Sequence, residues 1–237
     1  MPEHLSQMGS LPTPHQESPL HGYRGDRSSA NHPFLPGGLT IAISREAGSR
    51  GTSIAQRAGA KLGWQVYSQE LLEYIAQDAT VRQEILGNLS PAAVHWVEEQ
   101  LDRVHTEHSI HRHPFLVDMA RIILALGATG EVILIGRGAG YILPRSGTLH
   151  VRVVAPRADR IAYIGQWLRL SAEEATEQVR VRDERRAEFL RTHFRRDVSD
   201  VYQYDLLLNS TLLGEDLCAE LLTQAARAKV AALLTAE

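Results

Sequence analysis

Short apolar runs alternate with longer segments of helical periodicity from residue 39 to the end of the chain. The apolar runs are LTIAIS, WQVY, EVILIG, TLHVRVVA and YDLLLN, which begin at residues 39, 64, 131, 148 and 204. Each run is too short for a typical helix and is dominated by apolar positions, as in strands that are buried on both faces. Such strands separated by helices predict an α/β fold with a parallel central sheet flanked by helices.

The segments between these runs carry the start and stop signals of helices. Gly63 is a C-terminal signal for the first helix, and a break is expected near Gly87 with a restart at Ser90 as N-cap. Ser171 and Glu174 form a capping-box pattern at the start of a long polar helix. The expected helices cover residues 52–62, 69–105 with the break, 114–126, 158–168, 171 onward and 215–234.

The first 38 residues differ from the rest of the chain. They are rich in Pro, Ser, Gly and His and show no period. A segment of this composition buries too little apolar surface to offset the entropy lost on ordering. We therefore expect residues 1–38 to form a disordered tail, with a peptide-binding arm as the alternative, and residues 39–237 to form one domain.

Composition narrows the range of functions. The chain has 237 residues, is 43% hydrophobic and has a net charge of −3, so neither nucleic acid nor an anionic membrane is an expected partner. Its single cysteine, Cys218, suits a reducing cytosol. We find no apolar run near the roughly 18 residues of a membrane span and no secretory signal pattern, and we expect a cytoplasmic protein. The sequence does not indicate the oligomeric state.

The first strand runs into a glycine-containing turn, SREAGSRGT, at residues 44–52. Gly48 and Gly51 allow a tight turn, and a helix that begins at Thr52 would present its positive end to an anion. The hydroxyls of Thr52 and Ser53 could reach a phosphate or Mg²⁺. The turn therefore suggests a phosphate cradle, with an ordinary strand-to-helix turn as the alternative.

The turn departs from the usual phosphate-binding pattern G-x-x-x-x-G-K-[ST]. If Thr52 takes the hydroxyl place, Gly51 stands where the lysine belongs, and Arg45 and Arg50 stand where glycines belong. We expect Arg50 to replace the missing lysine, because it is adjacent to that place, with Arg45 as the second candidate.

Four segments in order resemble the nucleoside monophosphate kinases, and most closely their cytidylate kinase-like branch. They are ISREAGSRGTSIAQRAGAKLGW, EVILIGRGAGYIL, LHVRVVAPRADRIAYI and RVRDERRAEFLRTHFRRDVSDVYQYDLLLNST. Together they span roughly residues 39–230. The resemblance implies a P-loop NTPase-like three-layer fold, with a helical monophosphate-binding segment at about residues 71–113 and a lid. It also implies transfer of the γ-phosphoryl group of ATP, with Mg²⁺, to a pyrimidine nucleoside monophosphate such as CMP.

The resemblance also implies roles for individual residues. The ATP phosphates would lie on Gly48, Ser49, Arg50, Gly51, Thr52 and Ser53, with Thr52 also near Mg²⁺. The catalytic arginines would be Arg45, Arg50, Arg182 and Arg186, of which the last two belong to the lid. The acceptor would contact Arg137, Gly138 and Asp183, and we expect Asp183 to orient an arginine rather than act as a base.

Three positions depart from the family pattern. The branch often has arginine at the place of Thr52 and glycine at that of Arg50, and it often has aspartate at the place of Ser68. These changes leave two alternatives open: a nucleotide-binding protein without turnover, and a kinase for another small acceptor. Arg137 could equally be an exposed turn residue, and the lid arginines could be a solvated helix face.

The stretch HTEHSIHRH, at residues 105–113, contains four histidines. Their three-residue spacing could place two imidazoles near one metal ion. The stretch borders a loop and has few acids, so we expect a solvated polar connector, with the metal site as the alternative.

Overall fold

The computed structural model describes residues 37–110 and 113–235. Nearly all of the expected tail, residues 1–38, lies outside the described residues. Gly37 already belongs to the folded part, because its N–H donates to the carbonyl of Ala128 at 3.0 Å.

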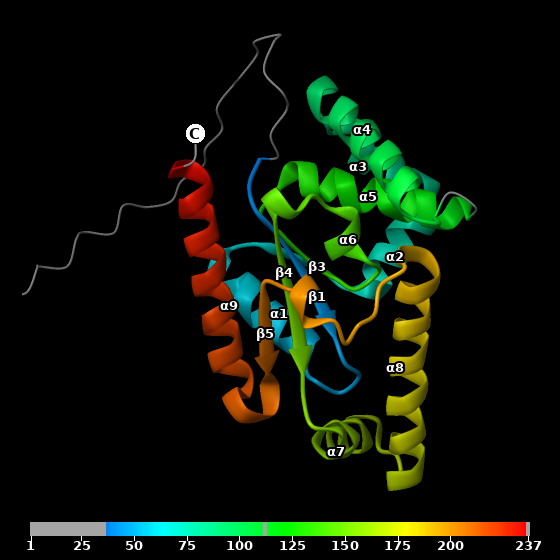
Figure 1. Ribbon diagram of the computed structural model, residues 1–237, viewed down its shortest axis with the longest axis vertical. Coiled ribbons are helices and arrows are strands. Elements are labelled where there is room, and N and C mark those ends of the chain that lie inside the picture. Colours follow the sequence, from blue (N-terminus) through cyan, green and yellow to red (C-terminus); the bar gives the residue numbers. More distant parts are fainter. Residues whose placement is uncertain (1–36, 111–112, 236–237) are drawn as a thin grey trace, which may run out of the picture. The chain divides into compact units, whose positions relative to one another are not determined.

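The five apolar runs form one parallel sheet, as predicted (Figure 1). The strand order is β2-β3-β1-β4-β5, so β1 lies at the centre between β3 and β4. Ile41 of β1 lies opposite Ile133 of β3 and Leu149 of β4. The strands are β1 Thr40–Arg45, β2 Gln65–Tyr67, β3 Val132–Ile135, β4 Thr148–Val154 and β5 Leu206–Asn209.

The α-helices lie where helical periodicity was found, with differences at their ends. They are α1 Gly51–Leu62, α2 Gln69–Gln77, α3 Ala79–Gly87, α4 Pro91–Glu107, α5 Pro114–Thr129, α6 Ala139–Ile142, α7 Arg157–Leu168, α8 Ala172–Phe194 and α9 Ser210–Thr235. The sequence did not reveal α6, which occupies a segment expected to be a turn. It also missed a second break at Asp78, whose carboxylate caps α3. Gly214 has non-helical angles and kinks the start of α9, so the long straight part begins near the expected residue 215.

Helices cover both faces of the sheet, which gives the three-layer arrangement (Figure 1). On one face, α1 and α9 pack on the strands through residues such as Ile54 and Leu222. On the other face, α5 is the central helix, and α2, α4 and the end of α8 join the same apolar cluster. Helices α7 and α8 pack on each other through a separate small cluster around Ile164 and Val179.

The topology brings three chain segments to one edge of the sheet. Because all the strands are parallel, the loops after β1, β3 and β4 leave from their carboxyl ends. Ligands of open α/β sheets bind in the crevice at this edge. The site is therefore expected where the SREAGSRGT turn, the GRG turn after β3 and the end of β4 meet.

Candidate functional site

A cavity of about 820 Å³ lies at this edge, between the strand ends and helix α8. Its walls come from β1, α2, the GRG turn, β4 and the middle of α8. They carry many charges of both signs, with arginines in the majority. The charged lining residues are Arg45, Glu46, Glu70, Arg137, Arg152, Arg182, Asp183, Glu184, Arg185 and Arg186.

Arg45 is the last residue of β1 and is largely buried, with 9% of its surface exposed. Its guanidinium donates to the side-chain oxygen of Gln69 at 3.3 Å and lies against the backbone of Gly136. Burial, together with the charge of Arg186, lowers the pKa of Arg45 to about 9. The side chain is still a cation at neutral pH, but its charge is poorly solvated, which favours an anion beside it.

Arg137 stands on a turn in which three successive residues have left-handed backbone angles. The φ values are 80° for Gly136, 54° for Arg137 and 73° for Gly138. The guanidinium donates to the Glu73 carboxylate and lies 5.4 Å from the ring centre of Phe189. Its Nε is buried and has no hydrogen-bond partner among the described residues. Arg137 is therefore only partly solvated, and it lines the cavity.

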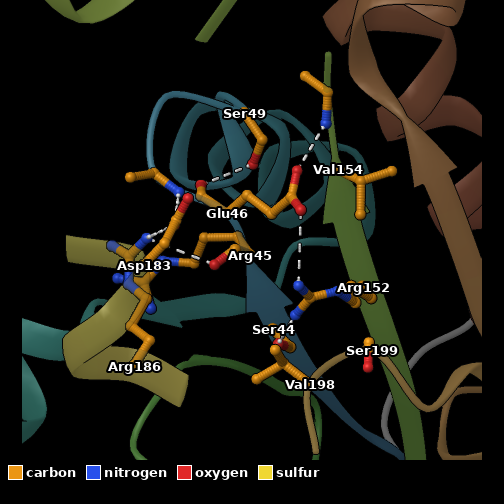
Figure 2. A network of polar contacts seen from close by, with 12 residues as sticks. Ser44, Arg45, Glu46, Ser49, Arg152, Val154, Asp183, Arg186, Val198 and Ser199 are labelled. Atoms are coloured by element: carbon orange, nitrogen blue, oxygen red, sulfur yellow. Dashed lines mark hydrogen bonds and ion pairs between the residues drawn. The ribbon is translucent and has the colours of Figure 1, made fainter. Parts of the chain in front are cut away.

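Arg182 and Arg186 also line the cavity, on helix α8. Arg186 is partly buried, and burial lowers its pKa, an effect that the charge of Arg182 strengthens and that of Asp183 opposes. The Nη1 of Arg186 lies 3.4 Å from the carbonyl of Arg45, as Figure 2 shows. The arginines of helix α8 and of the strand ends thus line the same cavity.

A second group of charges joins β1, β4, α7 and α8, and Figure 2 shows Glu46, Arg152 and Asp183 from this group. The Glu46 carboxylate accepts from the N–H of Ala155 at 3.1 Å and lies 3.7 Å from Arg152 and 3.3 Å from Arg160. The Asp183 carboxylate accepts from Arg160 at 2.5 Å. Its other oxygen accepts from the N–H of Ala47 at 2.7 Å.

The last of these contacts tests whether the loop suits an anion. The N–H of Ala47 points out of the loop and is within hydrogen-bond reach of a negatively charged oxygen. The Asp183 carboxylate of helix α8 accepts this hydrogen bond, and a phosphate oxygen could accept it in the same way. The loop backbone therefore fits an anionic ligand at this position.

The loop residues predicted to hold ATP lie beside the cavity, and residues 48–53, all of them described, do not line it. Gly48 packs against α7, because a Cβ there would lie 2.6 Å from the carbonyl oxygen of Arg160. Ser49 is fully buried, and its hydroxyl donates to the carbonyl of Glu46 at 2.9 Å. The exposed Thr52 stands in the first turn of α1, whereas the hydroxyl of Ser53 donates to Glu215 of α9.

The two candidate replacements for the lysine point in different directions. Arg50 is exposed, with its guanidinium 4.9 Å from the ring centre of Tyr163 and 3.8 Å from Glu215. Arg45 instead lines the cavity. Of the two, Arg45 is the one placed to reach a ligand in the cavity, whereas the sequence favoured Arg50, which is adjacent to the lysine place.

Steric constraints also explain why a glycine occupies position 51, where the P-loop pattern has a lysine. A Cβ on Gly51 would lie 2.8 Å from the Cβ of Arg45 and 3.2 Å from its Cγ. Real Cβ atoms do not approach other carbons this closely. A lysine at position 51 is therefore incompatible with the arginine at position 45 in this arrangement.

The histidine stretch is less solvated than expected. His108 is only 7% exposed and lies edge-on to Phe194, with ring centres 5.0 Å apart. His113 lies edge-on to His193 at 5.2 Å, and His111 falls outside the described residues. Among the residues that the structure describes, no group of three or more His, Cys, Asp or Glu could hold a metal ion.

The sequence analysis missed four side chains that shape the site. Arg152 could have been noticed, because it is a charged residue within the apolar strand TLHVRVVA. Arg160 belongs to the quoted RADRI segment, although its partners could not be inferred. Gln69 and Glu73 of α2 carried no signal, since polar residues four apart on a helix usually mark a solvated face.

Known proteins that are similar to this chain were found among solved structures and among family profiles. No curated protein is significantly similar to the chain in sequence. A crystal structure of an uncharacterized protein from Eubacterium ventriosum has a TM-score of 0.64 at 17% identity, covering 80% of this chain and 98% of that one. Shikimate kinase from Bacteroides thetaiotaomicron has a TM-score of 0.44 at 12% identity, covering 79% and 97%. Shikimate kinase from Acinetobacter baumannii, in complex with shikimate, has a TM-score of 0.44 at 13% identity, covering 79% and 92%.

The three-layer fold, the loop from β1 to α1 and the arginine-lined cavity define a protein with the fold of a P-loop kinase. The family is identified by sequence. The profile of the cytidylate kinase-like family matches residues 40–212, and the chain belongs to that family. None of the described helices is both long and apolar enough to cross a bilayer.

Proposed function

We propose that the protein transfers the γ-phosphoryl group of ATP to a pyrimidine nucleoside monophosphate such as CMP, in the cytoplasm. The observation that carries this proposal is the convergence of Arg45, Arg137 and Arg186 from three separate elements on one cavity. The positive charges of Arg186 and Arg137 both disfavour the charged form of Arg45. An anionic ligand in the cavity would offset this repulsion.

In this proposal the acceptor phosphate binds at the strand-end arginines. Arg137 would contact it from the left-handed turn, where Gly138 also lines the cavity and leaves room for the ring of Phe194. Arg45 and Arg186 approach from the other sides. Phosphoryl transfer depends mainly on positioning and on neutralising charge, which is the chemistry that such a cluster supplies.

ATP supplies the phosphoryl group when bound, and the SREAGSRGT loop would hold its phosphates. The backbone of residues 48–53, the positive end of α1 and the N–H of Ala47 are the groups available for them. Thr52 would be the protein ligand to Mg²⁺, whose other ligands are usually phosphate oxygens and water. Arg160 and the lid arginines Arg182 and Arg186 would face the transferred group.

We propose Arg45, rather than Arg50, as the cation that replaces the P-loop lysine. Its side chain leaves the strand beside Gly51, which is the lysine place, and ends in the cavity. Arg50 would instead lie outside the cavity, with its guanidinium over the ring of Tyr163.

A second function is favoured by one specific contact. Asp183 already occupies the N–H of Ala47 at 2.7 Å, and Gly51 leaves no room for the usual lysine. A nucleotide-binding protein without turnover would also have these features. A kinase for another small acceptor would keep the same arginines and differ only in what fills the rest of the cavity.

A coupled assay of ADP release tests these proposals with ATP, Mg²⁺ and a panel of acceptors that includes CMP, UMP and shikimate. The proposed function predicts ADP release that depends on CMP and is lost in Arg137→Ala. Arg121→Ala is the control, because this arginine pairs with Glu98 away from the cavity and should leave the rate unchanged. ATP binding without acceptor-dependent release would support the second function.

A further inference from the structure

Two polar side chains of α2 connect the arginines of the proposed acceptor site. Gln69 and Glu73 lie one helical turn apart, and the Gln69 amide donates to the Glu73 carboxylate at 3.0 Å. The Gln69 oxygen accepts from Arg45 at 3.3 Å, and the same Glu73 oxygen accepts from Arg137. The result is a continuous chain from Arg45 through Gln69 and Glu73 to Arg137.

The geometry points to Glu73 and Gln69 as positioning residues that hold the guanidinium groups of Arg137 and Arg45 for the acceptor anion. The inference rests on the proposed function, which makes these arginines the acceptor site. It assigns to α2 a role that neither the sequence pattern nor the family resemblance supplied.

Arg137 needs such a partner because its backbone does not restrain its long side chain. Glu73 accepts from the Nη2 of the guanidinium, and Arg137 also lines the cavity. A free arginine side chain loses rotamer entropy when it is fixed. A carboxylate that holds the guanidinium in advance reduces the entropy that binding of the anion must still cost.

The chemistry of position 69 suits glutamine in particular. Its amide must accept from Arg45 and donate to Glu73 at the same time, as the two contacts require. A glutamate would only accept, and a lysine or arginine would only donate.

Glu73 is distinct in role from the neighbouring Glu70. Glu70 lines the cavity and influences Arg45, Arg137 and Arg186 through its charge, without an ion pair among the described residues. Glu73 forms a direct ion pair with Arg137. A test must therefore separate the loss of a negative charge from the loss of alignment.

Three variants make that separation: Glu73→Ala, Glu73→Gln and Gln69→Ala. Steady-state kinetics with CMP and ATP should show KM for CMP raised roughly tenfold in Glu73→Ala, the loss expected from one misaligned charge-assisted hydrogen bond. KM for ATP should stay unchanged, and Glu73→Gln, which still accepts from Arg137, should recover most of the loss. Glu98→Ala removes a comparable ion pair on α4 and should leave both KM values unchanged.

A second measurement needs no substrate. The NMR signals of the Arg137 and Arg45 guanidinium groups, assigned by their loss in lysine variants, should show restricted rotation in the wild type. Glu73→Ala should release Arg137, Gln69→Ala should release Arg45, and Glu73→Gln should keep Arg137 restrained. If the wild type never phosphorylates CMP but these signals behave as stated, the proposed function fails and the positioning role stands. Unchanged rotation of Arg137 in Glu73→Ala overturns the positioning role, whatever the enzyme does.

Discussion

A substitution at position 51 tests directly whether close packing against Arg45 excludes the lysine that the P-loop pattern has at this position. Gly51 is the first residue of α1 and has ordinary helical angles, so an alanine there meets no backbone strain. The added Cβ would, however, lie 2.8 Å from the Cβ of Arg45 and 3.2 Å from its Cγ. We therefore expect Gly51→Ala to destabilise the protein, although glycine-to-alanine changes in helices usually stabilise.

The magnitude follows from two opposing contributions. Replacing glycine by alanine in a helix contributes up to about 1 kcal/mol of stability. Overpacking a tight site costs about 1–3 kcal/mol, and the larger cost applies here because both clashing atoms lie near a fixed strand. The net expectation is a loss of about 0.5–2.5 kcal/mol.

Truncating the Arg45 side chain should remove the destabilising effect of Gly51→Ala. In an Arg45→Gly background, Gly51→Ala should be neutral or stabilising, which gives a coupling free energy of about 1–3 kcal/mol between the two positions. Gly165→Ala in α7 is the control, because its Cβ would meet nothing closer than 3.5 Å. That variant should gain about 0.5–1 kcal/mol.

Urea unfolding measures all of these differences through the transition midpoint at constant m value. Equal effects of Gly51→Ala in the wild-type and Arg45→Gly backgrounds would refute the steric account. The absence of a lysine at position 51 would then need a cause other than the bulk of Arg45.

Two further predictions concern other parts of the molecule. Arg50→Gly should leave kcat/KM for ATP unchanged and stability equal or up to about 1 kcal/mol higher, since glycine relieves the left-handed angle of φ 59°; a tenfold loss of kcat/KM would restore Arg50 as the lysine replacement. Burial lowers the pKa of His150 from 6.5 to about 4. The folded state therefore favours the neutral ring, and this contribution is complete above pH 6.5 and is lost as the pH falls toward 4, by about 3 kcal/mol. Urea unfolding across this pH range should show a weaker pH dependence for His150→Phe, and an unchanged dependence would contradict the assignment.

The layers of the fold could be anticipated because buried parallel strands are short and apolar, as β1, β3 and β4 are. Caps such as Ser90 and Ser171 were visible for the same local reason, and both side chains accept from the backbone as expected. The short helix α6 was missed because four residues after a glycine turn carry no periodicity.

The site was less accessible to sequence reasoning, because its contacts join elements that lie far apart along the chain. Proximity along the sequence favoured Arg50 over Arg45, but the left-handed angles at position 50 direct the backbone outward and its side chain reaches Tyr163. Gln69 and Glu73 acquire meaning only once α2 is placed beside the GRG turn.

In the proposed reaction, a nucleoside monophosphate that is bound in the arginine-lined cavity accepts the γ-phosphoryl group of ATP. The most direct measurement uses ATP that is radioactively labelled in its γ-phosphoryl group, with Mg²⁺ and CMP, followed by separation of the nucleotides. We predict that the label appears in CDP with the wild type and with Arg50→Gly, and that no labelled CDP forms with Arg137→Ala. Label that remains in ATP, or is released only as inorganic phosphate while CMP is bound, would contradict it.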